Sequence, residues 1–301
     1  MEDTQHTEQR ILQQPPLRSR EDKRWEPLGR MFLGSFFRTL GIGLALLIVI
    51  VVMINMHWLP GTKSCNISVR TLHGVLYTYP AGTGDETSSY ALTRALEADD
   101  ANSDIDAVIL DIDSPGGYPV AGEEVAHALK RMTKPAVAVI RESGTSAAYW
   151  SATGASKIFA SENSDVGGIA VISSLTNESV KDKQDGIVYQ ELVTGKFKDL
   201  GNPHRALTPA EHDLLMRDLD IIHAHFVAAV ASGRGLLIGT VNALADGSSM
   251  TGDKAKEAGL VDMIGGIPEA RDYLGNLLKI DPVLCDSEGS LPADFLGGSS
   301  R

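Results

Sequence analysis

The sequence is short of cysteine and of positive charge. Cys65 and Cys285 are the only cysteines among 301 residues, so the chain has neither a disulfide scaffold nor a four-cysteine zinc site, and it can form at most one bridge. Lysine and arginine number 27 against 39 aspartates and glutamates, which gives a net charge of −12. An acidic chain lacks the basic surface that binds nucleic acid. We therefore expect no nucleic-acid partner.

Aromatic residues are also few, at 6%, while 43% of the residues are hydrophobic and 22% are charged. This composition can bury a core, and it excludes a disordered or collagen-like chain. Thirty glycines and thirteen prolines suit an α/β domain with many turns between strands and helices.

Charge is missing altogether from one long stretch. No charged residue occurs from Thr39 to Thr62, and residues 40–54 read LGIGLALLIVIVVMI. A helix needs roughly 20 apolar residues to cross a bilayer, and an unbroken apolar run leaves no polar face for water. We therefore expect residues 39–59 to form a transmembrane signal-anchor helix rather than a buried core helix. The 38 residues before the run are too many for the usual start of a cleavable signal peptide.

Basic residues flank this stretch unevenly. Those close before it are Lys23, Arg24, Arg30 and Arg38, whereas only Lys63 and Arg70 lie at a comparable distance after it. Because positive flanks stay in the cytoplasm, we expect a single-pass protein of the plasma (inner) membrane with a cytoplasmic N-terminus. Residues 1–38 are expected to be a mostly disordered tail. The function then belongs to the part of the chain outside the membrane.

Strand and helix signals alternate along that outer part. Strands are expected at 75–79, 106–112, 136–140, 157–160, 167–173 and 187–193, and helices at 90–97, 120–132, 146–152, 177–183 and 208–232. Repeated alternation predicts an α/β fold with a mostly parallel sheet and flanking helices. The Ser- and Gly-rich residues 286–301 are expected to be a flexible tail.

Two expected turns between a strand and a helix have residues suited to catalysis. In Asp113–Gly117, two glycines directly after a strand allow backbone N–H groups to face an anion, as an oxyanion hole requires. In Gly144–Ala148, Ser146 stands at a helix N-terminus, where free N–H groups favour developing negative charge. An ordinary turn at the first position and a simple helix cap at the second are the alternatives.

A serine nucleophile needs a base, and the spacing leaves the choice open. The histidines available are His127, His204, His212, His223 and His225. Lys196 and Lys198, at the end of an expected strand, offer a lysine base if burial lowers its pKa. Both lysines would lie on the same side of that strand, so strand alternation does not choose between them.

Five motifs together resemble one family. They are Asp106–Gly117 (DAVILDIDSPGG), Gly144–Trp150 (GTSAAYW), Gly167–Val171 (GGIAV), Thr194–Asp199 (TGKFKD) and Met250–Gly266 (MTGDKAKEAGLVDMIGG). In this order, over about residues 70–275, they resemble the signal peptide peptidase A (SppA) family of serine proteases. The resemblance implies a ClpP/crotonase-like fold for a peptidase domain at residues 70–275.

The resemblance also implies roles for single residues. Ser146 would be the nucleophile, Lys198 the general base, and the backbone N–H groups of Gly117 and Ala147 the oxyanion donors. The sequence departs from the family at three places: Ala147 and Ala148 follow Ser146 where two glycines are usual, Gly168 stands in place of a serine that would orient the lysine, and Asp113 stands where asparagine is common.

We therefore predict a membrane-anchored serine endopeptidase that degrades signal-peptide remnants or other unfolded membrane-derived peptides. It would use a Ser–Lys dyad, without metal or cofactor, and would assemble as a homo-oligomer. The alternative is a catalytically silent SppA-like scaffold, which the glycine at position 168 favours. A crotonase-like acyl-CoA enzyme is a third reading, although a domain outside the membrane would be separated from that cytosolic substrate.

The topology can be tested with a membrane-impermeant thiol reagent on intact cells. After reduction, the reagent is expected to label Cys285 and to spare a cysteine introduced into residues 1–38, because the basic residues precede the apolar stretch. Labelling of the introduced cysteine alone would reverse the orientation and place the domain in the cytoplasm.

Overall fold

The computed structural model describes residues 40–52, 65–79, 82 and 84–285. Residues 40–52, within the expected transmembrane segment 39–59, form a helix with exposed side chains. Within the described residues, no helix combines the length and the hydropathy needed to cross a membrane. The expected tails at 1–38 and 286–301 lie outside the described residues. The chain divides into two units, residues 1–62 and 63–301, and the second holds the sheet.

Parallel strands make up most of that sheet. The strands are β1 (Ile67–Tyr77), β2 (Glu86–Ser88), β3 (Ala107–Gly117), β4 (Ala136–Thr145), β5 (Lys157–Ala160), β6 (Asp165–Gly167), β7 (Ser249–Thr251), β8 (Met263–Ile264) and β9 (Leu284–Cys285). The main order is β2-β1-β3-β4-β5-β8, with β9 on β1 and β6 on β4. Among the described strands, only the β6–β7 pairing is antiparallel. The predicted mostly parallel α/β sheet is confirmed.

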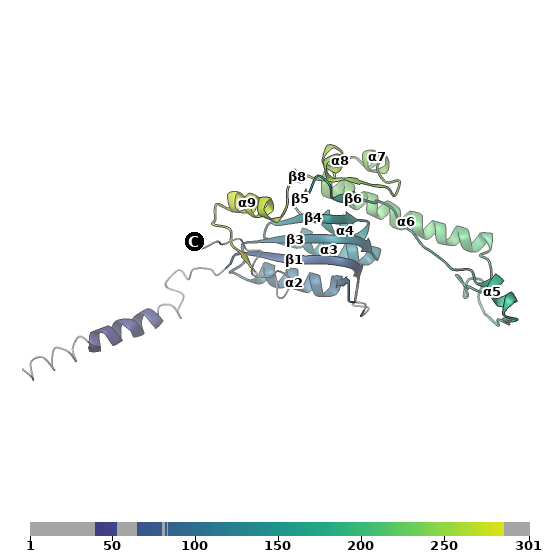
Figure 1. Cartoon of the computed structure of the whole chain (residues 1–301), viewed down its shortest axis with the longest axis horizontal. Coiled ribbons are helices and arrows are strands. Elements are labelled where there is room, and N and C mark those ends of the chain that lie inside the picture. Colours follow the sequence, from purple (N-terminus) through teal and green to yellow (C-terminus); the bar gives the residue numbers. More distant parts are fainter. Residues whose placement is uncertain (1–39, 53–64, 80–81, 83, 286–301) are drawn as a thin grey trace, which may run out of the picture. The chain divides into compact units, whose positions relative to one another are not determined.

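Helices cover both faces of the sheet (Figure 1). They are α2 (Ser89–Ala101), α3 (Pro119–Arg131), α4 (Ala147–Ala152), α5 (Ser179–Gln184), α6 (Pro209–Arg234), α7 (Ile238–Asn242), α8 (Gly252–Glu257) and α9 (Ile267–Leu278). The larger core packs α2, α3, α4 and the C-terminal half of α6 against one face. Ala270 and Leu274 of α9 cover the other face at Ile109 and Val139.

Most expected elements occur where the sequence pattern places them. The predicted strand 157–160 coincides with β5, and the predicted helix 208–232 corresponds to α6. The start of α6 is a capping box between Thr208 and Glu211, followed by Pro209 as the first helical residue, and this is the start signal that the sequence contains.

Three expectations about the site region are wrong. Asp113–Gly117 belongs to β3, because its end pairs with Val75 and Leu76 of β1 beyond a register shift. Of the predicted strand 167–173, only Gly167 belongs to a strand, as the last residue of β6. Residues 187–193 form no strand in the described chain. Strand-like residues here lack a partner strand: Val188 is 83% and Leu192 100% exposed.

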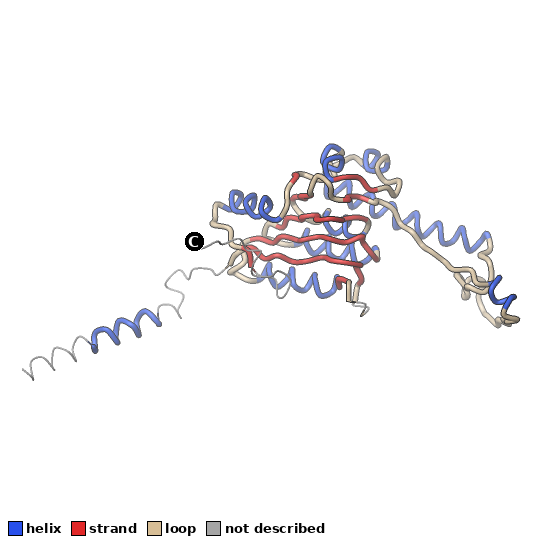
Figure 2. The backbone as a smooth tube through the Cα atoms, in the orientation of Figure 1, coloured by secondary structure: helices blue, strands red, loops and turns tan. Residues whose placement is uncertain are grey.

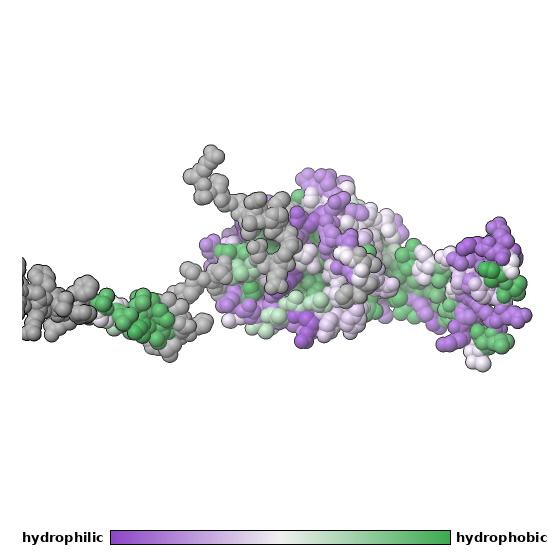
Figure 3. All heavy atoms as spheres, turned by 60° about the horizontal axis from the view of Figure 1, so that its bottom comes forward, coloured by the Kyte–Doolittle hydropathy of each residue, from purple (hydrophilic) through white to green (hydrophobic). Residues whose placement is uncertain are grey.

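Residues 171–208 form an arm that leaves the sheet beside α6, with α5 near its far end (Figure 2). Several of its large apolar side chains are exposed, including Ile172, Val180, Val188 and Leu192. Hydrophobic and hydrophilic surfaces alternate at this end of the molecule (Figure 3). The apolar sequence of the arm therefore does not serve the core of the same chain.

A disulfide joins Cys65 to Cys285 with their Cα atoms 4.9 Å apart. The disulfide stands next to the parallel pairing of β1 with β9, in which Ile67 is paired with Leu284 and Ser68 with Cys285. The Asn66 amide adds hydrogen bonds to the backbone at Asp281 and Val283. The bridge thus fastens the two ends of the sheet-containing unit to each other.

Removing this bridge is expected to destabilise the unit without changing its fold. A cross-link over 220 residues restricts the unfolded chain, and losing it costs about 2–4 kcal/mol. The double variant Cys65→Ser/Cys285→Ser should therefore unfold at lower urea concentration, with native circular dichroism in buffer. Equal unfolding midpoints for the variant and the oxidised parent would contradict the bridge.

Candidate active site

Ser146 stands at the turn from β4 into α4 in a strained backbone conformation. Its φ is +53° and its ψ is −128°, a region that non-glycine residues seldom adopt. Its N–H donates to the Gly167 carbonyl at 2.8 Å, and its carbonyl accepts from the Trp150 N–H at 2.9 Å. The turn is thus held by β6 on one side and by α4 on the other. Such a turn presents the hydroxyl ahead of a helix N-terminus, as in a nucleophile elbow.

Gly116 of β3 lies directly against this serine, and Gly117 lines a recess with it. Gly116 has a φ of +103°, and a Cβ built on it would lie 2.7 Å from the Ser146 Cβ and 2.9 Å from the Ala147 nitrogen. A Cβ on Gly117 would lie 2.1 Å from the Leu76 carbonyl oxygen. Only glycine allows this approach. The structure therefore brings together Ser146, Ala147 and Gly117, three of the four residues predicted for the site.

Ser114 has a different part in the same region. It is fully buried, its hydroxyl donates to the Gly74 carbonyl at 2.6 Å, and it accepts from the Gly116 N–H at 3.1 Å. Both partners stand at irregularities in the pairing of β1 with β3. Ser114 thus fixes the backbone that carries Gly116 to Ser146.

Two recesses open at Ser146. One of about 420 Å³ includes Thr145, Asp165 and Gly168, and one of about 90 Å³ includes Gly117, Ala147 and Trp150. They share Ser146 and the irregular segment 170–172. The floor of the smaller recess is the stacked pair Trp150 and Phe226, with ring centroids 4.8 Å apart.

The departures from the SppA pattern can now be located. Gly168 adjoins Ser146, since a Cβ on it would lie 3.4 Å from the Ser146 nitrogen, and its φ is +59°. Ala148 is fully buried in α4, where its methyl group belongs to the core. Asp113 accepts a hydrogen bond from the Ser143 N–H at 3.2 Å, which links β3 to β4. Ala147 lines the smaller recess at Ser146, and Gly168 lines the larger one.

Lys198 lies in the arm, in a turn rather than on a strand. Its neighbour Asp199 is connected through Arg205 to Glu211 in the first turn of α6. Glu211 precedes Phe226 by 15 residues of α6, which is about 22 Å of helix. The Phe226 ring stacks on Trp150, which follows Ser146 by one helical turn. One chain therefore leaves Lys198 on the order of 20 Å from Ser146.

The two lysines that the sequence leaves as alternatives differ in their surroundings. The Lys196 ammonium lies over the Phe197 ring, 4.8 Å from its centroid. Lys198 is exposed, with its backbone N–H bonded to the Gly195 carbonyl at 3.2 Å.

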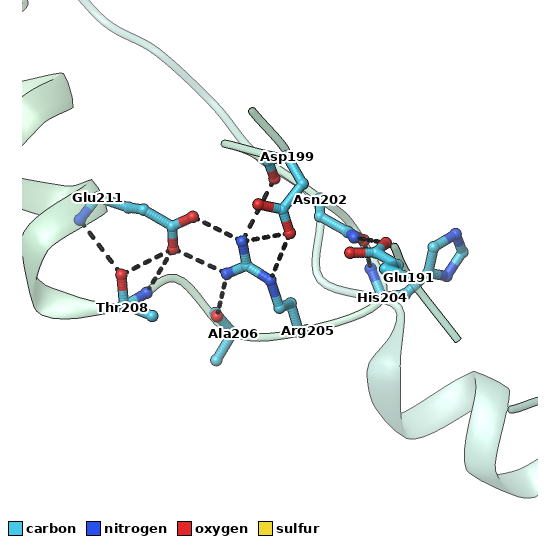
Figure 4. Close-up of polar contacts among 8 residues, drawn as sticks. All are labelled: Glu191, Asp199, Asn202, His204, Arg205, Ala206, Thr208 and Glu211. Atoms are coloured by element: carbon cyan, nitrogen blue, oxygen red, sulfur yellow. Dashed lines mark hydrogen bonds and ion pairs between the residues drawn. The ribbon is translucent and has the colours of Figure 1, made fainter. Parts of the chain in front are cut away.

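A polar network holds the Lys198 turn onto α6 (Figure 4). The Arg205 guanidinium donates to the Asp199 carboxylate at 2.8 and 3.1 Å and to the Glu211 carboxylate at 2.6 and 2.8 Å. The Arg205 hydrogen bonds lower the pKa of Asp199 and, with those of Thr208, lower the pKa of Glu211 to about 2. Both carboxylates therefore stay charged over the whole neutral and mildly acidic range.

The histidines lie elsewhere. None of the five that the sequence offers as a base lines either recess at Ser146. Three possible metal ligands, Glu178, Asp182 and His204, lie within 4.8 Å of one another in the arm. The His204 Nδ1 and the Asp182 carboxylate are 2.9 Å apart, a hydrogen bond that accounts for their proximity. The His223 Nε2 is buried without a hydrogen-bond partner among the described residues.

The fold and site together are those of an α/β protein with a half-buried serine at a tight turn between a strand and a helix, beside a pair of glycines. The sequence pattern of peptidase family S49 matches residues 128–281, a range that includes Ser146 and Lys198. The chain belongs to peptidase family S49. The resemblance to SppA proteases inferred from the motifs is confirmed.

Individual relatives agree with this assignment. A putative protease of Methanocaldococcus jannaschii is 33% identical over 67% of this chain and 65% of its own length. A putative protease of Synechocystis sp. is 33% identical, over 58% and 64%, and a putative signal peptide peptidase SppA of Enterococcus faecium is 31% identical, over 58% and 52%. This chain thus spans between about half and two thirds of these relatives.

Among solved structures, this chain is similar to the ClpP1 N165D mutant from Listeria monocytogenes. The match has a TM-score of 0.46 and 14% identity, and it covers 68% of this chain and 94% of that one.

The sequence motifs did not single out Arg205 or Glu211 as parts of the site region. Glu211 was visible only as the third residue of a capping box, and Arg205 stands in a loop without a motif. Two acidic residues, each six positions from an arginine, are too common in loops to be a signal before the contacts are known.

Stability measurements can separate the roles of the two serines without an activity assay. Ser114→Ala is expected to lower the free energy of unfolding by about 1–3 kcal/mol, because the Gly116 N–H loses its buried partner. Ser146→Ala is expected to change it by less than about 1 kcal/mol, since the Ser146 hydroxyl makes no cap hydrogen bond. Urea denaturation followed by circular dichroism measures both. A larger loss at Ser146 than at Ser114 would reverse the two assignments.

Proposed function

We propose that this protein is a membrane-anchored serine endopeptidase in which Ser146 attacks the peptide carbonyl and Lys198 accepts its proton. The observation that supports it best is the strained turn at Ser146 packed against Gly116 and Gly117. A tetrahedral oxyanion formed on Ser146 would accept hydrogen bonds from the N–H groups of Gly117 and Ala147. The proton from the hydroxyl passes to the lysine and then to the leaving amine, and water hydrolyses the acyl-enzyme.

The distance within one chain requires a second copy for this dyad. A lysine side chain extends about 6 Å from its Cα, far less than the roughly 20 Å of helix between the arm and Ser146. We therefore assign the base of each site to Lys198 of a neighbouring copy. Lys196, whose ammonium group packs over the Phe197 ring, is the less suited of the two lysines.

The exposed arm supports a homo-oligomer. Ile172, Val188 and Leu192 are between 83% and 100% exposed, and apolar side chains that gather on one arm are typical of an interface between proteins. Residues 170–172 of the same segment also line both recesses at Ser146. An arm that covers a neighbouring copy would thus close a site while it delivers a lysine.

The proposed location rests on the sequence and the disulfide. The uncharged stretch 39–62 and the basic residues before it favour a single-pass anchor with the domain outside the plasma membrane. The bridge between Cys65 and Cys285 suits the oxidising side of that membrane.

The proposed substrates are unfolded, membrane-derived peptides such as signal-peptide remnants. The 90 Å³ recess is lined by Pro119, Trp150 and Phe226 among others, so it favours an apolar side chain beside the cleaved bond. An anchored domain would meet such peptides where they leave the bilayer.

A catalytically silent scaffold is the second candidate, and Gly168 favours it. A serine at that position would stand beside Ser146 and orient the lysine, whereas glycine offers no hydroxyl. A serine-reactive phosphonate discriminates the two functions, because an endopeptidase is labelled covalently at Ser146 and a silent scaffold is not.

Peptide cleavage by the purified full chain in detergent tests the dyad. Ser146→Ala and Lys198→Met are each expected to abolish turnover, because one removes the nucleophile and the other its base. Lys196→Met is the matched control and should keep the activity and its pH profile. Without an orienting serine at position 168, we expect activity to rise toward alkaline pH with an apparent pKa of about 8–9.

Mixing the two inactive variants tests the sharing of sites between copies. Ser146→Ala and Lys198→Met should regain part of the activity when their subunits are allowed to exchange, because a mixed interface pairs an intact Ser146 with an intact Lys198. An active Lys198→Met enzyme with an inflection near pH 6–7 would instead indicate a histidine base and contradict the proposed dyad.

A further inference from the structure

The turn that contains Lys198 has little support of its own. Residues 194–200 are exposed apart from Asp199 and Leu200, and they form no strand or helix. Their backbone hydrogen bonds join residues only three positions apart: the Lys198 N–H donates to the Gly195 carbonyl, and the Leu200 N–H donates to the Phe197 carbonyl. A turn of this kind samples many conformations unless side chains fix it. A base held on such a turn needs an anchor.

Arg205 supplies that anchor on the side of the lysine. Its Nε and one terminal nitrogen donate to the Asp199 carboxylate, and the same terminal nitrogen reaches the Asp199 carbonyl at 3.4 Å. Asp199 follows Lys198 directly, so these bonds fix the peptide plane beside the lysine. The Asp199 carbonyl also accepts from the Asn202 N–H at 3.0 Å, which closes the turn.

The other side of Arg205 is held by a rigid element. Two of its nitrogens donate to the Glu211 carboxylate, whose side chain is only 3% exposed. Glu211 also accepts from the backbone N–H and the hydroxyl of Thr208, at 2.8 and 2.9 Å, at the start of α6. The planar guanidinium therefore joins the lysine turn to a 26-residue helix with a geometry that an ammonium group does not reproduce.

We propose that Arg205 is the positioning residue for the Lys198 base: it fixes the turn on α6 so that the lysine is presented to Ser146 in a constant geometry. This inference rests on the proposed Ser–Lys function. Catalysis by a general base needs placement within hydrogen-bond reach of the proton, and a misplacement of about 1 Å can cost on the order of 100-fold in rate. Because Gly168 cannot orient the lysine from the nucleophile side, the arm has to do so.

The test compares Arg205→Lys with the wild type in the peptide-cleavage assay. The substitution keeps the positive charge and loses the fork between Asp199 and Glu211. We expect kcat to fall about tenfold or more with KM within about twofold, because a less well placed base slows the chemical step rather than binding. The alkaline inflection of the pH profile should also move upward, since a lysine that is less well buried in the site has a pKa nearer its ordinary value.

Asp199→Asn provides an independent arm of the test, because it weakens the bonds of Arg205 to the lysine turn and leaves those to Glu211. It should lower kcat and shift the pH inflection in the same direction, and the double variant Arg205→Lys/Asp199→Asn should be little worse than either single variant. Additive losses would mean that the two residues act separately, which overturns the inference.

Thr208→Ala is the matched control for a merely structural effect. It removes a cap hydrogen bond at the same helix start, at a cost of about 1 kcal/mol, but it leaves the bonds between Arg205 and Asp199. Its pH inflection should equal that of the wild type. If Thr208→Ala shifts the inflection as much as Arg205→Lys does, the effect is one of arm stability and positioning by Arg205 is overturned. An Arg205→Lys enzyme with the pH profile of the wild type also overturns the positioning role of Arg205.

Lys198→Met, assayed beside these variants, separates failure of this inference from failure of the proposed function. An inactive Lys198→Met enzyme together with a fully active Arg205→Lys enzyme refutes only the positioning role. An active Lys198→Met enzyme refutes the dyad and, with it, any positioning of that lysine. Size-exclusion chromatography of each variant at the assay concentration must give the wild-type oligomer, and activity of Arg205→Lys restored by raising the protein concentration would identify an assembly defect and overturn the inference.

Discussion

The site depends on the contact between two backbone segments at the carboxyl end of the sheet. The Gly116 backbone and the Ser146 turn approach so closely that no side chain fits between them. This approach requires parallel pairing of β3 with β4, where Ser114 faces Gly144 beyond a register shift. It also requires the buried Ser114 hydroxyl to hold Gly116 in place. The helices of the larger core, which are α2, α3, α4 and the C-terminal half of α6, pack against these strands.

Much of this could be predicted from the sequence, because short-range chemistry decides it. Apolar runs at 106–112 and 136–140 predicted the central strands, and the Thr208–Glu211 pattern predicted the start of α6. The motifs at Gly117 and Ser146 predicted two segments that the fold brings together. Local patterns did not predict residues 187–193 correctly. Their β-branched and aromatic residues suit a strand, but a strand forms only where a partner offers its backbone, and this chain provides none within the described residues.

The position of Lys198 could not be predicted for a related reason. Its motif TGKFKD identifies the residue but not its place, which is set by contacts of Asp199 with Arg205 and Glu211 across a loop without regular structure. An arginine fork between two carboxylates is a tertiary feature. The same is true of the bridge between Cys65 and Cys285, because two cysteines 220 positions apart allow a disulfide without indicating that their strands are neighbours.

That bridge also decides what a cut in the chain does to the molecule. The arm at 171–208 is exposed and lacks regular structure over most of its length, so it is open to another protease. A single cleavage there separates the backbone into two pieces, but Cys65 belongs to one piece and Cys285 to the other. The pieces remain one covalent molecule. A nicked chain would therefore migrate as a single species until its disulfide is reduced, and the half with Ser146 would not be released from the half with α9.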